Sequence, residues 1–291
     1  MLAFDVGGTN IRYGVITDSK NITTSHSLPT PREHGEFLSL LTDVIRSFSS
    51  ETNVVLGIPG AINTYTGTVD AAPNIPLPPR FTLKEYLSQH FPDKIITLFN
   101  DADLIAMGEF SETYPHTDAP FVALTLGTGI GSGIVINKKL FTGINGYGSE
   151  AGHTIVDFRK DAHVCSCGNK GCAESYFSAR ALCEEHRLLT GIESQNAQEA
   201  IAYLRENAPD SLNNALDAFA ALVASLINTL HPSHIRYYGG LSAFVTESLE
   251  NLKQRIAQRL FTDSIDTIDF SPSTLKDAAY LFGALYSRSE C

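Results

Sequence analysis

Three of the five cysteines lie close together, between residues 153 and 174. They are Cys165, Cys167 and Cys172. The surrounding loop is rich in Gly, Lys and Asn, so it has little apolar surface in which thiols would be buried. With one histidine, either His153 or His163, the three thiolates would form the tetrahedral Cys3His set of a structural zinc site. The alternatives are a metal-free loop with three buried thiols and a disulfide between the first two cysteines, which would be strained.

The pair Asn100-Asp101 lies where a predicted strand, residues 95–99, gives way to a predicted helix, residues 102–110. An aspartate at such a point can accept a proton from a substrate hydroxyl while a phosphoryl group arrives. The competing interpretation is that Asp101 only caps the helix, as aspartate does at many helix starts. Asp103 is expected on the helix surface.

Two further acidic residues flank the cysteine loop. Glu150 lies three residues before His153, and Glu174 closes the loop. Carboxylate oxygens accept hydrogen bonds, which is what recognition of neighbouring sugar hydroxyls requires. A histidine that binds a metal through one ring nitrogen keeps the other nitrogen for a hydrogen bond. We therefore regard these three residues as candidates for binding a sugar, and we expect Arg180 on a solvated helix face.

Two glycine-rich turns could hold phosphate, residues 5–10 (DVGGTN) and residues 127–133 (GTGIGSG). Glycine lets backbone N–H groups approach an anion closely. A strand, not a helix, is predicted after the second turn, so the dinucleotide-binding fingerprint is not met, and the sequence has no G-x4-G-K-[ST] motif. Asp5 could orient a hydrated Mg2+, and Gly239-Gly240 could pass close to an adenosine. A plain hairpin is the alternative for each turn.

The order of the predicted elements indicates two α/β halves, because each half opens with a strand, a glycine turn and a second strand. Strands are predicted at 2–6, 11–16, 22–27, 53–58, 95–99, 121–126, 134–136 and 235–238. Helices are predicted at 36–49, 83–90, 102–110, 175–187, 196–206, 211–230, from about 242 to 259 and at about 275–291. We expect a duplicated α/β architecture with a cleft between lobes 1–115 and 116–274, and a final helix that returns to the first lobe. Residues 61–81 are predicted to be irregular.

The chain has 291 residues and a net charge of -11. This acidity argues against a nucleic-acid partner, because contacts with phosphate backbones use Lys and Arg. No run reaches the ~18 apolar residues of a membrane span, and the N-terminus lacks the basic and apolar regions of a signal peptide. An odd number of cysteines, three of them clustered, favours a reducing compartment. We therefore expect a cytoplasmic protein that binds neither membranes nor nucleic acid.

Together these motifs resemble the ROK family of sugar kinases, within the actin/hexokinase-like ATPase superfamily. The resemblance covers nearly the whole chain. It rests on DVGGTNIR (5–12), GIPG (57–60), FNDAD (99–103), LGTGIGSGI (126–134), E-x-G-H (150–153) and C-x-C-G-x-x-G-C-x-E (165–174). It implies a two-lobed fold of duplicated ribonuclease H-like domains with an interlobe cleft. It also implies transfer of a phosphoryl group from ATP, with Mg2+, to a hydroxyl of a hexose or N-acetylhexosamine.

The same resemblance implies roles for individual residues, with Asp101 as the general base. The implied sugar-binding residues are Gly60, Asn74, Asn100, Glu150, His153 and Glu174. The implied ATP and phosphate residues are Asp5, Gly7, Gly8, Thr9, Asn10, Arg12, Thr128, Gly129, Gly131, Gly239 and Gly240. The implied zinc ligands are His153, Cys165, Cys167 and Cys172.

Two positions depart from the usual family pattern. Ser149 precedes Glu150 where the family usually has glycine, and Asn10 stands where many members have lysine. The segments LPTPR (28–32), KKLFTG (138–143) and ESYFSARAL (174–182) are most similar to members that phosphorylate N-acetylglucosamine on its 6-hydroxyl. Glucose, N-acetylmannosamine and fructose are the alternative substrates. A non-catalytic, sugar-responsive regulator is the alternative class, and a homodimer is a family expectation.

Overall fold

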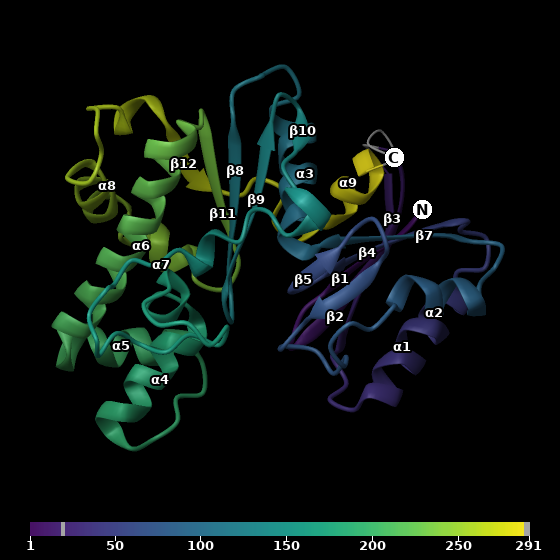
Figure 1. The fold of residues 1–291 in the computed structure, drawn as a ribbon, viewed down its shortest axis with the longest axis horizontal. Coiled ribbons are helices and arrows are strands. Elements are labelled where there is room, and N and C mark those ends of the chain that lie inside the picture. Colours follow the sequence, from purple (N-terminus) through teal and green to yellow (C-terminus); the bar gives the residue numbers. More distant parts are fainter. Residues whose placement is uncertain (19–20, 288–291) are drawn as a thin grey trace. The chain divides into compact units, whose positions relative to one another are not determined.

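The computed structural model describes residues 1–18 and 21–287, and their contacts divide the chain into two compact units (Figure 1). The first unit comprises Met1–Asp118, Gly133–Ser149 and the chain from Thr274 onward, and the second comprises Ala119–Ser132 and Glu150–Ser273. The predicted boundary near residue 115 lies close to the end of the first segment. Residues 133–149, which the predicted ranges assigned to the second lobe, group with the first unit by their contacts.

The first sheet has the strand order β3-β2-β1-β4-β7. Its strands are β1 (Leu2–Val6), β2 (Asn10–Asp18), β3 (Asn21–Pro29), β4 (Asn53–Ile58) and β7 (Ile95–Asn100). β1 pairs antiparallel with β2 and parallel with β4, and β4 pairs parallel with β7. All five residues of β1 are buried, as expected for a central strand that is covered on both faces.

Four α-helices of the described residues belong to the first unit. They are α1 (His34–Ser47), α2 (Leu83–His90), α3 (Asp101–Thr113) and α9 (Ala279–Tyr286). Figure 1 shows α1 and α2 along one side of the first sheet, with α3 and α9 on its other side. The apolar stripe predicted for α1 is buried, including Phe37, Leu41 and Ile45. The segment 61–81, predicted as irregular, contains a short hairpin of β5 (Ala61–Asn63) and β6 (Thr68–Ala71).

Helix α9 packs closely against α3. A Cβ atom at Gly108 would lie 2.0 Å from the carbonyl oxygen of Ala279, and one at Gly283 would lie 1.9 Å from that of Leu104. The two helix backbones therefore touch at glycines, which no other residue would permit. The buried carboxylate of Glu109 also accepts a hydrogen bond from the backbone N–H of Thr274 at 2.7 Å. Of the helix predicted at about 275–291, residues 288–291 lie outside the described residues.

The second sheet repeats this plan, with the order β10-β9-β8-β11-β12. Its strands are β8 (Phe121–Leu126), β9 (Ile130–Ile136), β10 (Lys139–Leu140), β11 (His234–Tyr238) and β12 (Asp269–Pro272). β11 pairs parallel with both β8 and β12, and β9 pairs antiparallel with β10. The predicted duplication of an α/β architecture is therefore confirmed. β12 was not predicted, because a four-residue strand containing Ser and Pro has no apolar periodicity.

Five α-helices of the described chain belong to the second unit. They are α4 (Ala179–Thr190), α5 (Ala197–Asn207), α6 (Pro209–Leu230), α7 (Ser242–Glu247) and α8 (Leu249–Ala257). Short 3-10 helices are η1 (Ile144–Gly146) and η5 (Lys276–Ala278) in the first unit and η2 (Ala151–His153), η3 (Ala173–Ser175) and η4 (Ile265–Thr267) in the second. The predicted stripe of α6 is buried, and its Phe219 stacks on Phe177 at 4.3 Å between ring centroids. The helix predicted from about 242 to 259 is broken at Ser248 into α7 and α8.

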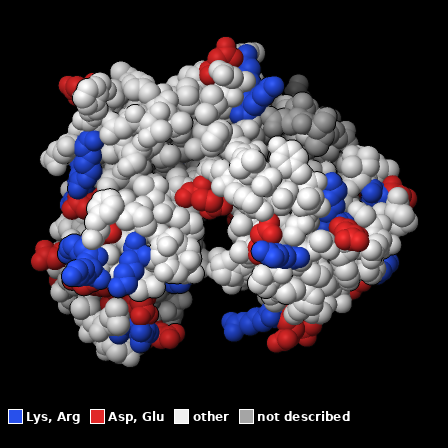
Figure 2. Space-filling model, viewed as in Figure 1, with Lys and Arg blue, Asp and Glu red and all other residues white. Residues whose placement is uncertain are grey.

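No helix among residues 1–18 and 21–287 is long and apolar enough to cross a membrane. On the face drawn in Figure 2, Lys and Arg are interspersed with Asp and Glu and do not form one continuous basic patch.

Candidate active site and metal cluster

The carboxyl ends of β1, β4 and β7 bring several predicted site residues of the first unit together. In the parallel pairing, Asp5 of β1 is the partner of Gly57, and Ile58 of β4 is the partner of Asn100. Parallel strands end at the same edge of a sheet, and ligands of open α/β sheets bind at that edge. The residues that directly follow each strand are therefore the candidates for a binding site in this unit.

Asn100, not Asp101, is the N-cap of α3. Its side-chain oxygen accepts hydrogen bonds from the backbone N–H groups of Ala102 at 2.9 Å and Asp103 at 3.3 Å. Its side-chain nitrogen donates to the carbonyl oxygen of Gly60 at 3.0 Å, which leaves one amide hydrogen for a ligand. Asp101 is the first residue of the helix, where the helix dipole favours a carboxylate. Asp103 is 1% exposed, so the expectation that it lies on the helix surface was wrong.

The first glycine turn rests against the loop that follows β6. The backbone N–H of Gly7 donates to the carbonyl oxygen of Asn10 at 2.9 Å, which closes the turn. A Cβ atom at Gly8 would lie 3.0 Å from the carbonyl oxygen of Asn74. Gly8, Thr9 and Asn10 are exposed. A residue predicted to bind phosphate and one predicted to close over the sugar are therefore direct neighbours.

Asp5 and Arg12 form an ion pair inside the first unit, with 2.6 Å between Oδ2 and Nη2. Arg12 also pairs with Asp277. Burial raises the pKa of Asp5, and the Arg12 guanidinium in contact with it partly opposes that rise. The structure therefore places the two predicted phosphate-site residues against each other.

The second glycine turn is shorter than predicted. Residues 127–129 alone form the turn, because β9 begins at Ile130 and already includes Gly131. The prediction of Gly131 as a turn residue was therefore wrong. The glycines in β9 reflect packing: a Cβ atom at Gly133 would lie 2.4 Å from the side chain of Ala106 on α3. Within the turn, Thr128 is exposed.

Gly239 and Gly240 follow β11, next to the end of β8. Gly239 has a φ of 109°, and a Cβ atom there would lie 2.5 Å from the carbonyl oxygen of Leu126. Only glycine meets both conditions. A Cβ atom at Gly240 would meet nothing within 4 Å, so the backbone there is open to a ligand. Since Leu126 directly precedes the turn 127–129, two predicted nucleotide-binding stretches lie side by side in the second unit.

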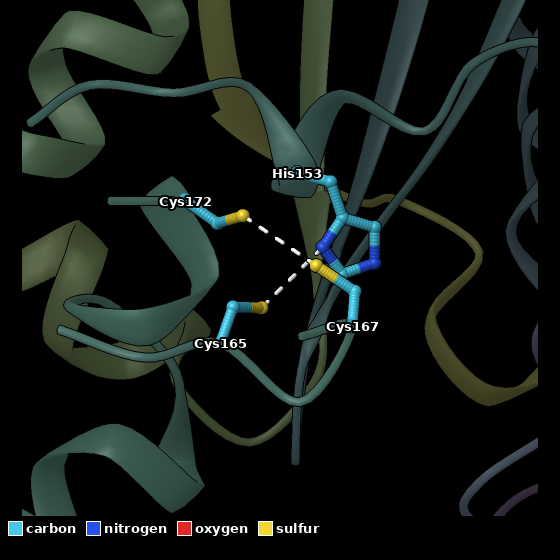
Figure 3. A group of neighbouring side chains, drawn as sticks. All are labelled: His153, Cys165, Cys167 and Cys172. Atoms are coloured by element: carbon cyan, nitrogen blue, oxygen red, sulfur yellow. Dashed lines mark hydrogen bonds between the residues drawn. The ribbon is translucent and has the colours of Figure 1, made fainter. Parts of the chain in front are cut away.

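The cysteine loop gathers a metal-binding set of side chains (Figure 3). One potential ligand atom from each of His153, Cys165, Cys167 and Cys172 lies within 4.8 Å of the others. The Nδ1 atom of His153 is 3.5 Å from the sulfur of Cys165, and the sulfurs of the other two cysteines are 3.7 Å apart. Tetrahedral zinc would separate two sulfurs by about 3.8 Å and a sulfur and a nitrogen by about 3.5 Å, given its usual bond lengths. The donor set and its spacing therefore fit a structural zinc ion.

His163 is excluded as the fourth member of this cluster. Its ring stacks on Tyr176, with 4.2 Å between ring centroids. Its Nδ1 atom lies 3.1 Å from the carbonyl oxygen of Ser175. His153 is the histidine that turns Nδ1 towards the thiols, and this leaves Nε2 on the opposite side of the ring (Figure 3). The alternative between the two histidines, which the sequence left open, is thus decided by geometry.

Glu150 and Ser149 lie just before this cluster. Ser149 has a φ of 68°, a left-handed conformation that glycine adopts without strain. Glu150 is exposed, yet the protein around it raises the pKa of its carboxyl by desolvation, with His153 opposing the rise and Glu174 adding to it. Two other predicted sugar-binding residues of the second unit therefore act electrostatically on Glu150.

Glu174 is 7% exposed and links the cysteine loop to the second glycine turn. Its Oε2 accepts a hydrogen bond from the backbone N–H of Ile130 at 2.9 Å. Its Oε1 accepts from Ser166 at 3.0 Å and from Arg180 at 2.8 Å. Arg180 is exposed, as expected for a solvated helix face, but it also forms an ion pair with Glu174. Sequence reasoning missed this contact and that of Ser166, and the one available signal was their closeness to Glu174 and the cysteines along the chain.

The repeated sheets, each with a glycine turn at the start, define the actin/hexokinase-like ATPase fold. The chain belongs to the ROK family, whose model matches residues 1–289. An N-acetyl-D-glucosamine kinase of Citrobacter koseri is 33% identical over 276 residues, which cover 88% of this chain and 89% of that protein. The predicted family, fold and enzyme class, an ATP-dependent carbohydrate kinase, are therefore confirmed.

Solved structures show the same fold. A ROK family glucokinase from Streptomyces griseus, in complex with glucose and AMPPNP, matches with a TM-score of 0.81 and 26% identity, over 100% of this chain and 99% of that chain. A ROK hexokinase from Thermus thermophilus matches with a TM-score of 0.80 and 24% identity, over 99% of this chain and 98% of that chain.

Proposed function

We propose that this protein transfers the γ-phosphoryl group of ATP to the 6-hydroxyl of N-acetyl-D-glucosamine. The observation that supports this substrate most directly is the similarity to an N-acetyl-D-glucosamine kinase along 88% of the chain. The position of Asp101 at the start of α3, next to a cap that contacts Gly60, supports the kinase chemistry.

In the proposed reaction, the Asp101 carboxylate accepts the proton of the sugar hydroxyl. The hydroxyl oxygen then forms a bond to the γ-phosphorus of ATP, while the bond between that phosphorus and the β,γ-bridging oxygen breaks and ADP leaves. The exposed backbone of Gly8, Thr9 and Asn10 and the turn 127–129 would donate N–H groups to phosphate oxygens. Gly239 and Gly240 would border the nucleoside.

Magnesium would neutralise phosphate charge in this reaction. Asp5 is the residue of the first unit that would hold it, through water, since Mg2+ usually keeps several waters and binds through one or two carboxylates. One oxygen of the Asp5 carboxylate already forms an ion pair with Arg12. The carboxylate therefore suits an indirect contact with the metal through water.

The sugar would be bound by hydrogen bonds from several side chains. Asn100 has one amide hydrogen left for a hydroxyl, and His153 has Nε2 left once Nδ1 faces the cysteines. Glu150 and Glu174 would accept hydrogen bonds from hydroxyls, while the loops at Gly60 and Asn74 close over the sugar. We propose that zinc, bound by His153, Cys165, Cys167 and Cys172, holds these side chains in position without taking part in the reaction.

A coupled ADP-release assay over N-acetylglucosamine, glucose, N-acetylmannosamine, mannose and fructose tests the substrate. We expect the highest kcat/KM for N-acetylglucosamine. Asp101→Asn should lower kcat about 10²–10⁴-fold while sugar and ATP still bind. A higher kcat/KM for another sugar would reassign the substrate, and undiminished turnover in the variant would refute Asp101 as the base.

The proposal also has a competing function and an expected oligomeric state. A sugar-responsive regulator is the competing function, and sugar binding without ADP release in the assay would favour it. We also propose a homodimer, which light scattering on the purified protein would test.

A further inference from the structure

We propose that Glu174 and Arg180 form a strut that transmits the position of the cysteine loop to the glycine turn 127–129. Arg180 is then a positioning residue for ATP, although it touches neither substrate. This inference rests on the proposed function, in which that turn binds ATP phosphates. All the residues involved belong to the second unit.

One end of the strut is the hydrogen bond from the backbone N–H of Ile130 to the carboxylate of Glu174, at 2.9 Å. Ile130 is buried and directly follows the turn. A hydrogen bond from a backbone N–H to a buried carboxylate is stronger than a bond between neutral groups. A Cβ atom at Gly129 would lie 2.3 Å from the same carboxylate oxygen, so Glu174 lies directly against the turn.

The other end of the strut is in the cysteine loop. Arg180 donates hydrogen bonds to the carboxylate of Glu174 at 2.8 Å and to the hydroxyl of Ser166 at 2.9 Å. Ser166 lies between the cluster members Cys165 and Cys167, and it also donates to Glu174 at 3.0 Å. Two side chains therefore fix the carboxylate from the side of the metal cluster.

Two further contacts join the turn and β9 to the same part of the unit. The backbone N–H of Ala179, at the start of α4, donates to the carbonyl oxygen of Gly127 at 2.9 Å. The backbone N–H of Ala151, in η2 next to His153, donates to the hydroxyl of Ser132 at 3.0 Å. The turn is thus held on its backbone by elements that carry or border the metal cluster, whereas its own Thr128 is exposed.

Arg180 matters in this arrangement because it fixes the orientation of the Glu174 carboxylate. The side chain of Arg180 is 41% exposed, so its ion pair adds little to overall stability. Without it, Oε1 of Glu174 keeps only the hydrogen bond from Ser166 in the zinc-loaded protein, because Cys165 is then a thiolate with no proton to donate. The carboxylate can then rotate, and the Ile130 N–H loses its aligned acceptor. The N–H groups of the turn would consequently be less well directed at phosphate.

The test is the equilibrium binding of AMPPNP by calorimetry, without sugar and without turnover, on the zinc-loaded protein. Arg180→Met should raise the Kd of AMPPNP about tenfold, the loss expected when a charge-assisted hydrogen bond is disturbed. Ser166→Ala should raise it in the same direction and serves as the second variant if Arg180→Met does not fold. Zinc content and melting temperature are measured on every variant.

Arg187→Met is the matched control. Arg187 lies on the same helix, has an exposure of 44% and forms an ion pair with Glu184 at 2.6 Å. Arg187→Met should leave the Kd of AMPPNP within about twofold of the wild-type value, since surface ion pairs of this kind contribute little. If folded, zinc-containing Arg180→Met and Ser166→Ala both bind AMPPNP as Arg187→Met does, the strut is refuted. If the wild-type protein itself does not bind AMPPNP, the proposed function is refuted instead.

Discussion

The side-chain amide of Asn100 donates a hydrogen bond to the carbonyl oxygen of Gly60, at 3.0 Å, while its oxygen caps α3. One residue thus fixes both the helix that begins with Asp101 and a loop at the end of β4. The interpretation of this strand-to-helix junction as a mere helix cap is therefore incomplete, because the cap and the proposed base are separate, adjacent residues.

Asn100→Ala should lower kcat by about tenfold or more, since Asp101 loses the cap that orients its helical turn. It should also cost about 1 kcal/mol of stability, as loss of an N-cap usually does. The matched control is Asn196→Ala, because Asn196 caps α5 by accepting from the N–H of Glu199 at 3.0 Å. Steady-state kinetics and thermal melting check both. Equal kcat values in the two variants would contradict the positioning role.

Cys167→Ser should reduce zinc content, lower the melting temperature and raise the KM for the sugar about tenfold or more, because metal-linked support of binding residues is lost. Cys183→Ser is the control, since Cys183 lies on α4 and is not a member of the cluster. Metal analysis and sugar kinetics provide the measurement. A folded, zinc-free variant with an unchanged sugar KM would show that zinc does not support the sugar site.

Ser149→Gly should stabilise the protein by about 1 kcal/mol, because a left-handed backbone at a non-glycine residue stores strain of that order. The φ of Ser149 is 68°. Ser248, with a φ of -95°, provides the control, and Ser248→Gly should be neutral or destabilising since glycine gains freedom in the unfolded chain. Thermal melting distinguishes them, and a lower melting temperature for Ser149→Gly would refute the strain.

Glu150 should make stability depend on pH in an unusual direction. Desolvation raises the pKa of its carboxyl, so ionisation of Glu150 costs folding free energy above the raised pKa, and this cost disappears as the pH falls below the ordinary value. Glu150→Gln should therefore melt higher than wild type near pH 8 and equally near pH 4, on the scale of ordinary glutamate pKa values of about 4.3.

The control is Glu184→Gln, for which we expect the opposite pH dependence of stability, since Arg187 lowers the pKa of Glu184. Its ionised form stabilises the fold above the unfolded pKa, and that contribution is lost as the pH falls through the folded value. Melting curves from about pH 4 to 8 compare the two. A difference between Glu150→Gln and wild type that stays constant with pH would contradict the raised pKa.

The residues whose chemistry is local were found from the sequence. The cysteine spacing identified the cluster because metal ligands must come from a few residue types close together. Asp101 was predicted as the base because a carboxylate at a strand-to-helix junction lies at the edge where sheets bind ligands, and that role stays a prediction. Long amphipathic helices such as α1 and α6 were also predicted well, because their apolar residues repeat with the helical period.

Features that depend on distant partners were missed. Gly131 was assigned to a turn because glycine is common in turns, but it lies in β9. Another glycine of that strand, Gly133, allows a close contact with α3. Arg180 is exposed, as expected, but its ion pair with the buried carboxylate of Glu174 was missed, since only the fold brings the two side chains together. The choice between His153 and His163 likewise required the direction of a ring, which residue spacing does not contain.

The glycine contact between α3 and α9 has a consequence for synthesis of the chain. Because Gly108 meets Ala279 backbone to backbone, the helix that begins with Asp101 lacks its packing partner until the ribosome has made α9. Translation of the intervening residues takes on the order of ten seconds at about 5–20 residues per second. During that interval α3 lacks the cover of α9, so the first unit should complete its packing only after α9 has been made.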